Sequence, residues 1–242
     1  CAEMAAREAA AAGIHVNFSP MVDLARDPRW GRVMETCGED PYLASVMGAA
    51  QVKAYQGEDI SAHDHLAACV KHFAAYGGAE AGRDYNAVEV SERTLRQFYL
   101  PAYKACVDAG VRVLMPSFND LNGVPSTANT FLMKQILEQE WGYRGVTVSD
   151  WGAIAELCKQ GVAEDLKEAA YKAFTAGCQI EMMTPSYYRH LVELVREGSI
   201  PESAIDEAVL RILKLKDDLG LFEDPFHGAD EAKGEAMFLC PE

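Results

Sequence analysis

The 242-residue sequence lacks several features that would define a class of protein. It has no apolar run as long as a membrane span, no Gly-x-Gly-x-x-Gly motif and no phosphate-binding P-loop. Neither membrane insertion nor a common nucleotide-binding fold therefore has support. The first residues also lack the basic-then-apolar pattern of a secretory signal, and we therefore expect a cytoplasmic location.

Positive charge is scarce. Lys and Arg number 22 against 37 Asp and Glu, which gives a net charge of -15. Nucleic acids and anionic membranes repel such a surface, so we expect neither as a partner. The charge balance favours a protein that binds a neutral small molecule.

Cysteine motifs are absent as well. The cysteines number seven, are scattered, and form no Cys-x-x-Cys or Cys/His pair with metal-ligand spacing. We therefore expect no metal and no cofactor. Several cysteines lie within apolar runs, which favours buried free thiols in a reducing compartment.

Strand-like and helix-like segments alternate along the chain. Helices are predicted to begin at Asp40-Pro41, at Ser91, at Asn129 or Thr130, and before the apolar positions 205–213. Pro101 should kink or end the second of these helices, and Gly220 should end the last. Short apolar runs between these helices predict buried strands, at residues 14–18, 66–70, 111–115, 146–148 and 178–182. This alternation is typical of a parallel sheet in an α/β fold.

A (β/α)8 barrel fits the strand spacing, but the predicted strands are too few to close one. The first dozen residues already have the pattern of a helix that precedes a strand. We therefore expect a partial TIM-like barrel whose first strands are missing. The barrel domain is predicted over residues 1–226, followed by a loosely structured linker or tail, 227–242, towards an absent second domain.

Polar residues follow most of the predicted strands, where the catalytic residues of βα barrels lie. Asp150 and Trp151 follow the strand at 146–148, and Lys71 and His72 end the strand at 66–70. From spacing alone, Asp150 is equally consistent with a nucleophile and with the cap of the next helix.

The motifs together resemble glycoside hydrolase family 3, in its β-glucosidase-like branch. The resemblance rests on Asp27-Pro28-Arg29-Trp30-Gly31-Arg32, on Gly38-Glu39-Asp40-Pro41, on Lys71-His72-Phe73 and on Ser149-Asp150-Trp151, in the order that this family uses. It covers nearly the whole chain and implies the N-terminal barrel domain, truncated at both ends.

The resemblance implies a retaining β-glycosidase. Asp150 would be the nucleophile that forms a covalent glycosyl-enzyme on terminal β-D-glucosyl residues, and an acid/base glutamate would come from outside this chain. The implied partner is a β-glucoside or oligosaccharide. A β-xylosidase is the alternative within enzymes, and a non-catalytic carbohydrate-binding or structural remnant is the alternative outside them. Missing segments, a second chain or self-association would complete the barrel.

The family pattern also implies a set of substrate-binding residues, namely Arg32, Lys71, His72, Arg83, Phe118, Trp151 and Met183. Ordinary salt bridges are the alternative for the arginines, and a core position is the alternative for His72 and Met183. Neighbouring residues of a regular strand point to opposite faces. For Lys71 and His72 to reach one sugar, we predict a bulge or a cis peptide there.

Overall fold

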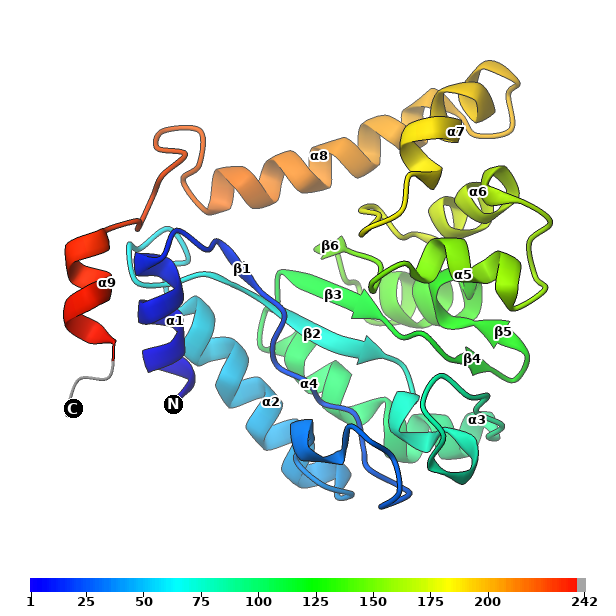
Figure 1. Ribbon diagram of the computed structural model, residues 1–242, viewed down its shortest axis with the longest axis horizontal. Coiled ribbons are helices and arrows are strands. Elements are labelled where there is room, and N and C mark those ends of the chain that lie inside the picture. The colour runs from blue at the N-terminus through cyan, green and yellow to red at the C-terminus, as the bar shows by residue number, and fades with distance from the viewer. Residues whose placement is uncertain (239–242) are drawn as a thin grey trace.

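The computed structural model of the chain describes residues 1–238. A four-stranded parallel sheet lies at its centre, in the order β1-β2-β3-β6 (Figure 1). Its strands are β1 (Val16–Asn17), β2 (Ala67–Phe73), β3 (Val113–Pro116) and β6 (Val146–Thr147). A separate antiparallel hairpin pairs β4 (Asp120–Leu121) with β5 (Val124–Pro125). The described sheet is open, so the α/β fold with an incomplete barrel is confirmed.

Helices connect the strands, in chain order α1 (Ala2–Ala11), α2 (Pro41–Gln56), α3 (Glu92–Thr94), α4 (Pro101–Asp108), α5 (Ala153–Lys159), α6 (Leu166–Ala176), α7 (Ser186–Arg196), α8 (Glu202–Asp218) and α9 (Glu231–Met237). Two π-helical segments, η4 (Leu95–Tyr99) and η6 (Phe131–Glu140), and four single 3₁₀ turns, η1 (Val33–Glu35), η2 (Tyr76–Gly78), η3 (Glu80–Gly82) and η5 (Ser126–Ala128), complete the order. None of the helices in the described residues is long and apolar enough to cross a membrane.

Both faces of the sheet are buried, which explains why its strands read as continuous apolar runs. Along β2, Val70 joins the cluster shared with α2 and α4, whereas Cys69 joins a second cluster on the opposite face. This second cluster includes Leu215 of α8 and Leu219 just beyond it. Figure 1 shows α8 crossing the side of the sheet away from α2 and α4.

The predicted helix starts are confirmed by their caps. The Asp40 side chain accepts the N–H of Tyr42, with proline in the first turn of α2. The Ser91 hydroxyl accepts the N–H of Thr94 at the start of α3. Pro101 begins α4 directly after the π-helical segment η4, so the helical winding changes there.

Two predictions of secondary structure were wrong. Residues 178–182 form no strand, since only Ile180 bridges to Val148. The Gln179 side chain accepts the Thr147 N–H at 2.7 Å and replaces part of a regular ladder. The tail is also not loosely structured throughout, because Asp230 caps α9 and its N–H binds the carbonyl of Ala11. The domain boundary itself stays a prediction.

Candidate active site

The carboxyl ends of β2 and β6 bring the predicted residues together. His72 lies in β2, and Asp150 follows β6 by three residues. Their side chains meet, with His72 Nε2 3.4 Å from Asp150 Oδ2. The two residues are 78 positions apart in sequence and come together because parallel strands end at the same edge of the sheet.

The backbone at the end of β2 departs from a regular strand, as predicted. The Lys71–His72 and Phe73–Ala74 peptide bonds are both cis. The register of β2 against β3 also shifts between Lys71 and Phe73. The Lys71 ammonium and the His72 ring both act electrostatically on Asp150, so consecutive residues contribute to the same site.

His72 is held on both sides by carboxylates. Its side chain is 1 % exposed, and its Nδ1 lies 2.9 Å from Asp23 Oδ2. The same carboxylate oxygen accepts the backbone N–H of His72 at 2.9 Å. The other oxygen of Asp23 accepts the Tyr103 hydroxyl at 2.7 Å. Asp23 therefore fixes the orientation of the imidazole ring, and the Nε2 of that ring faces Asp150.

Asp150 is buried and incompletely hydrogen-bonded. Oδ1 accepts the N–H of Trp151 at 2.7 Å, whereas Oδ2 is buried without a hydrogen bond to any described residue. Burial raises the pKa of the Asp150 carboxyl, although His72, the Trp151 N–H, Lys71 and Arg32 oppose this shift. The effect of burial on this pKa outweighs that of the nearby cations.

The helix-cap alternative for Asp150 was wrong. Helix α5 begins after Gly152, which has φ +71° and no side chain to cap it. The Asp150 side chain makes no hydrogen bond to the first turn of α5. The carboxylate therefore faces His72 rather than the helix.

Arg32 approaches the site from the loop after β1. Its guanidinium forms a two-pronged ion pair with Glu35, at 2.6 Å from Nε and 2.9 Å from Nη2. It also lies over the ring of Tyr76, 5.6 Å from the centroid. The hydrogen bond to Glu35 raises the Arg32 pKa, and the same contact lowers that of Glu35. This arrangement fixes a permanent cation beside Asp150.

Aromatic rings form one wall of the site. Tyr76 is fully buried and contacts the rings of Trp30, His72 and Phe118 at 5.1, 5.4 and 5.9 Å between centroids. Phe118 is 6 % exposed and also lies 4.6 Å from the Tyr85 ring. Trp30 is 1 % exposed and donates its Nε1–H to Asp84, so it serves the core rather than a sugar.

The remaining predicted residues lie at the surface. Trp151 and Met183 expose 61 % and 60 % of their area, which suits a rim that contacts ligand from outside. Met183 is therefore not in the core. Arg83 is exposed, and its side chain makes no hydrogen bond or ion pair within residues 1–238. The structure brings Arg32, Lys71 and His72 to Asp150, whereas the role of Arg83 stays a prediction.

Sequence reasoning missed Asp23 and Tyr103 as parts of this site. Asp23 follows β1 among other charged residues, and only its position near a strand end could have singled it out. Tyr103 lies within α4, in a pattern that reads as core. Glu156 of α5 also lies near Asp150, and burial raises its pKa.

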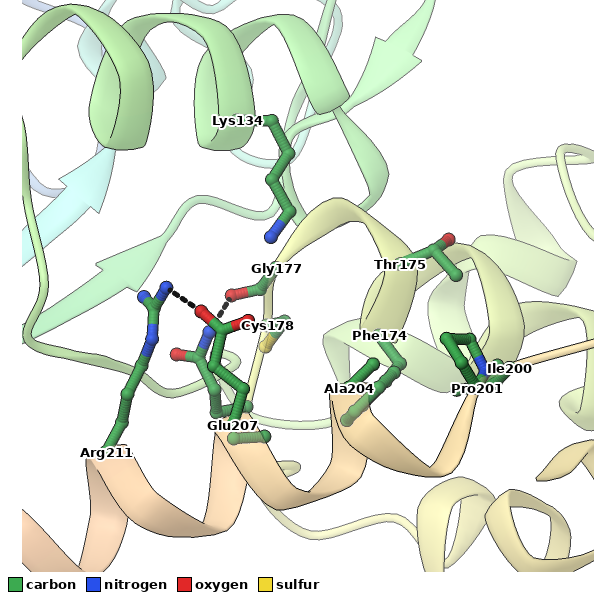
Figure 2. Close-up of a pocket in the computed structure, with 12 residues that line it drawn as sticks. Lys134, Phe174, Thr175, Gly177, Cys178, Ile200, Pro201, Ala204, Glu207 and Arg211 are labelled. Atoms are coloured by element: carbon green, nitrogen blue, oxygen red, sulfur yellow. Dashed lines mark hydrogen bonds and ion pairs between the residues drawn. The ribbon is translucent and has the colours of Figure 1, made fainter.

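A separate cavity of about 180 Å³ lies between α6, η6 and α8 (Figure 2). Its polar groups pair with one another, since Arg211 contacts Glu207 and the Gln179 amide donates to the Gly177 carbonyl. It shares no lining residue with the site around Asp150. In the described part of the chain, no cluster of three or more His, Cys, Asp or Glu could hold a metal ion.

Comparison with known proteins places these residues in a family. The glycosyl hydrolase family 3 N-terminal domain matches residues 1–215. A periplasmic β-glucosidase of Salmonella typhimurium is 44 % identical over 223 residues, which is 92 % of this chain and 29 % of that protein. A putative β-xylosidase of Formosa agariphila is 38 % identical and covers 96 % of this chain and 31 % of its own length.

Solved structures of similar proteins share the fold of this chain. A β-glucosidase of Listeria innocua in complex with glucose superposes with a TM-score of 0.96 at 51 % identity, covering 99 % of this chain and 33 % of that protein. A mutant of that enzyme in complex with laminaribiose gives a TM-score of 0.96 at 50 % identity, with 99 % and 34 % coverage. The chain thus spans about a third of the length of the relatives it matches.

Proposed function

The chain belongs to glycosyl hydrolase family 3, and on that premise we propose that it carries the nucleophile half of a retaining β-glycosidase site. The observation that carries this proposal is Asp150, a buried carboxylate that has one oxygen free of hydrogen bonds, lies 3.4 Å from His72 and is influenced by the charges of Lys71 and Arg32. A carboxylate nucleophile needs an unblocked oxygen, and nearby cations keep part of the population ionised.

In the proposed reaction, Asp150 attacks the anomeric carbon of a terminal β-D-glucosyl residue. The glycosidic C–O bond breaks as the leaving oxygen takes a proton from an acid outside this chain, and a covalent glycosyl–Asp150 ester forms. Water then attacks the same carbon, gives its proton back to that acid/base group and releases Asp150.

The cationic side chains would bind the sugar hydroxyls. Lys71, His72 and Arg32 supply N–H donors, and a charged donor forms a stronger hydrogen bond than a neutral one. Trp151 and Met183 at the rim would contact the sugar ring or aglycone, and Arg83 would join them. Phe118 offers an apolar face without the hydroxyl that a tyrosine would add.

Relatives named β-glucosidase and β-xylosidase both match the chain, so an experiment has to decide which sugar it prefers. An activated aryl β-glucoside is the suitable substrate, because its good leaving group needs little acid assistance. We expect the chain to hydrolyse it faster than the matching xyloside. A 2-fluoro glucoside should label Asp150, as seen by peptide mass. The reverse preference would favour a β-xylosidase, and no labelling by either sugar would favour the non-catalytic remnant.

The location of the acid/base group gives a matched control. Asp150→Asn should abolish labelling. A β-glucoside with a poor leaving group needs the acid, so Glu156→Gln should leave the turnover of such a substrate unchanged if the acid lies outside this chain. A large loss of turnover in Glu156→Gln would contradict that part of the proposal.

Completion of the barrel by other segments, a second chain or self-association is proposed alongside, and a solution mass measurement tests it. A cytoplasmic location stays a prediction, because the similar Salmonella β-glucosidase is named periplasmic. Fractionation of the native host tests it.

A further inference from the structure

Asp23 has no task in the proposed reaction, yet it is buried directly behind the site. It is 1 % exposed and contacts no solvent-facing partner. Its Oδ2 faces both the backbone N–H and the Nδ1 of His72 at 2.9 Å, and its Oδ1 accepts the Tyr103 hydroxyl. A buried carboxylate with this many polar contacts is costly to assemble, so its effect on His72 needs an explanation.

The neighbours of Asp23 determine where protons lie. Tyr103 has a single hydroxyl proton and lies within 2.7 Å of Asp23 and 2.6 Å of the His72 carbonyl. The backbone N–H of His72 is a fixed donor to Asp23. The Tyr103 proton can go to Asp23 Oδ1 or to the His72 carbonyl, whereas the His72 backbone N–H is always directed at Asp23 Oδ2. An ionised Asp23 fits these contacts, and Nδ1 of His72 then carries the proton that faces it.

The other ring nitrogen then faces a second carboxylate. His72 Nε2 lies 3.4 Å from Asp150 Oδ2, which is buried and has no hydrogen bond. Two lone pairs facing each other in this interior would repel, so one proton must lie between them. It lies either on Nε2, which gives an imidazolium and an ionised Asp150, or on Asp150, which leaves both groups neutral.

The charge of Asp23 decides between these two states. A carboxylate 2.9 Å from the ring attracts an imidazolium much more strongly than a neutral imidazole, and the surrounding interior weakens this attraction little. The other groups that face the pair are Tyr103, the ring edge of Tyr76, the Trp151 N–H, Lys71, Arg32, Glu35 and Glu156, of which Glu156 alone disfavours an ionised Asp150 by its charge. The two cations among them favour an ionised Asp150, and Glu35 favours a charged His72.

We propose that Asp23 is a positioning residue that keeps His72 as an imidazolium and thereby keeps Asp150 ionised for attack. The assignment of charge to His72 stands on the geometry alone, and only the consequence for attack rests on the proposed function. Tyr103 has the smaller task of holding Asp23 in place.

Nitrogen NMR on the 242-residue chain tests the proposal without any turnover. With ¹⁵N-labelled histidine, long-range ¹H–¹⁵N spectra report whether each ring nitrogen carries a proton, and a His72→Gln sample assigns the signals. Near neutral pH we expect both nitrogens of His72 to be protonated. In Asp23→Asn, which keeps the shape and one acceptor oxygen, Nε2 should lose its proton. Tyr103→Phe keeps the charge and should retain the imidazolium signals.

A neutral His72 ring in the wild-type chain would overturn the proposal, as would an unchanged imidazolium in Asp23→Asn. If Asp23→Asn does not fold, a neutral ring in the wild-type spectrum still overturns the proposal, and Asp23→Glu, which keeps the charge, should then fold and retain the imidazolium signals. Asp23→Asn should also slow labelling by the 2-fluoro glucoside at saturating reagent, by about tenfold when the pH lies below the pKa of Asp150, where each unit of rise in that pKa lowers the ionised fraction about tenfold. A wild-type chain with an imidazolium but no labelling would contradict the proposed function and leave this inference standing.

Discussion

Replacing the proposed nucleophile should make the protein more stable. Asp150→Asn keeps the size and shape of the side chain and removes its charge. The wild-type carboxylate has a buried oxygen without a hydrogen bond, and burial raises its pKa. The asparagine amide oxygen can accept the Nε2–H of His72, whose charge stays balanced by Asp23. No buried charge is then left uncompensated on this side of the ring.

The magnitude follows from that one oxygen. A buried polar group without a partner costs about 1–3 kcal/mol, and more when it is charged. We therefore expect Asp150→Asn to raise the free energy of unfolding by about 1–3 kcal/mol near neutral pH. Each kcal/mol moves the thermal midpoint by roughly 2–4 °C in a domain of this size.

The pH dependence has a definite sign. Because the folded pKa of Asp150 lies above its ordinary value of 3.8, the neutral form stabilises the fold at low pH. That contribution is complete below the unfolded pKa and is lost as pH rises through the folded pKa. The advantage of Asp150→Asn should therefore be small in acid and should grow from about pH 3.8 upward.

Thermal and urea unfolding, followed by tryptophan fluorescence across this pH range, measure the effect. Asp40→Asn is the matched control, because asparagine and aspartate cap a helix about equally well and Asp40 is exposed at the start of α2. An Asp150→Asn chain that is no more stable than the wild type near neutral pH would refute the reasoning.

Two further substitutions probe the walls of the site. Gly77→Ala should lower the free energy of unfolding by about 3 kcal/mol or prevent folding, because the new Cβ would lie 1.9 Å from the Leu24 carbonyl oxygen. Gly31→Ala is the control and should be tolerated, because its Cβ would meet no atom within 4 Å. Equal stabilities of the two variants in urea would contradict this. Arg32→Lys loses the two-pronged contact with Glu35 that holds the Arg32 side chain in place, and with it the proposed hydrogen bond from Arg32 to the sugar. Because a charged hydrogen bond contributes about 1.5–3 kcal/mol, the half-saturating concentration of the 2-fluoro glucoside should rise about tenfold or more. An unchanged concentration dependence would place Arg32 outside the sugar site.

The strands that the sequence predicted are those whose alternate residues enter two cores. Val70 and Cys69 pack on opposite faces of β2, so the segment is apolar throughout and visible as a run. Residues 178–182 include Gln179 and Glu181, and besides a few backbone bonds they bond through the side chains of Thr147 and Gln179, which a hydropathy pattern does not report. Helix α9 was missed because it buries none of its residues completely and contains a glycine.

The site could be predicted only as far as its motifs reach. Asp150, Lys71 and His72 stand at strand ends, and the parallel sheet brings those ends together. Asp23 and Tyr103 are separated from each other by 80 residues, and Asp23 from His72 by 49. Their contact depends on how α4 packs against β2, which is a property of the tertiary structure and leaves no local pattern in the sequence.

The two carboxylates beside His72 are both buried, yet they differ in how their oxygens are bonded. Both oxygens of Asp23 accept hydrogen bonds, from Tyr103 and from His72. Such a carboxylate is stabilised in its ionised form and has no oxygen free to react. Asp150 keeps one oxygen without a hydrogen bond, at a cost in stability, and in the proposed function that oxygen is the one that attacks the sugar. If the proposals hold, one fully bonded acid fixes the charge of a histidine and one partly bonded acid reacts, and environment alone separates the two roles. The same imidazole links them, so the charge on Asp23 and the reactivity of Asp150 should change together.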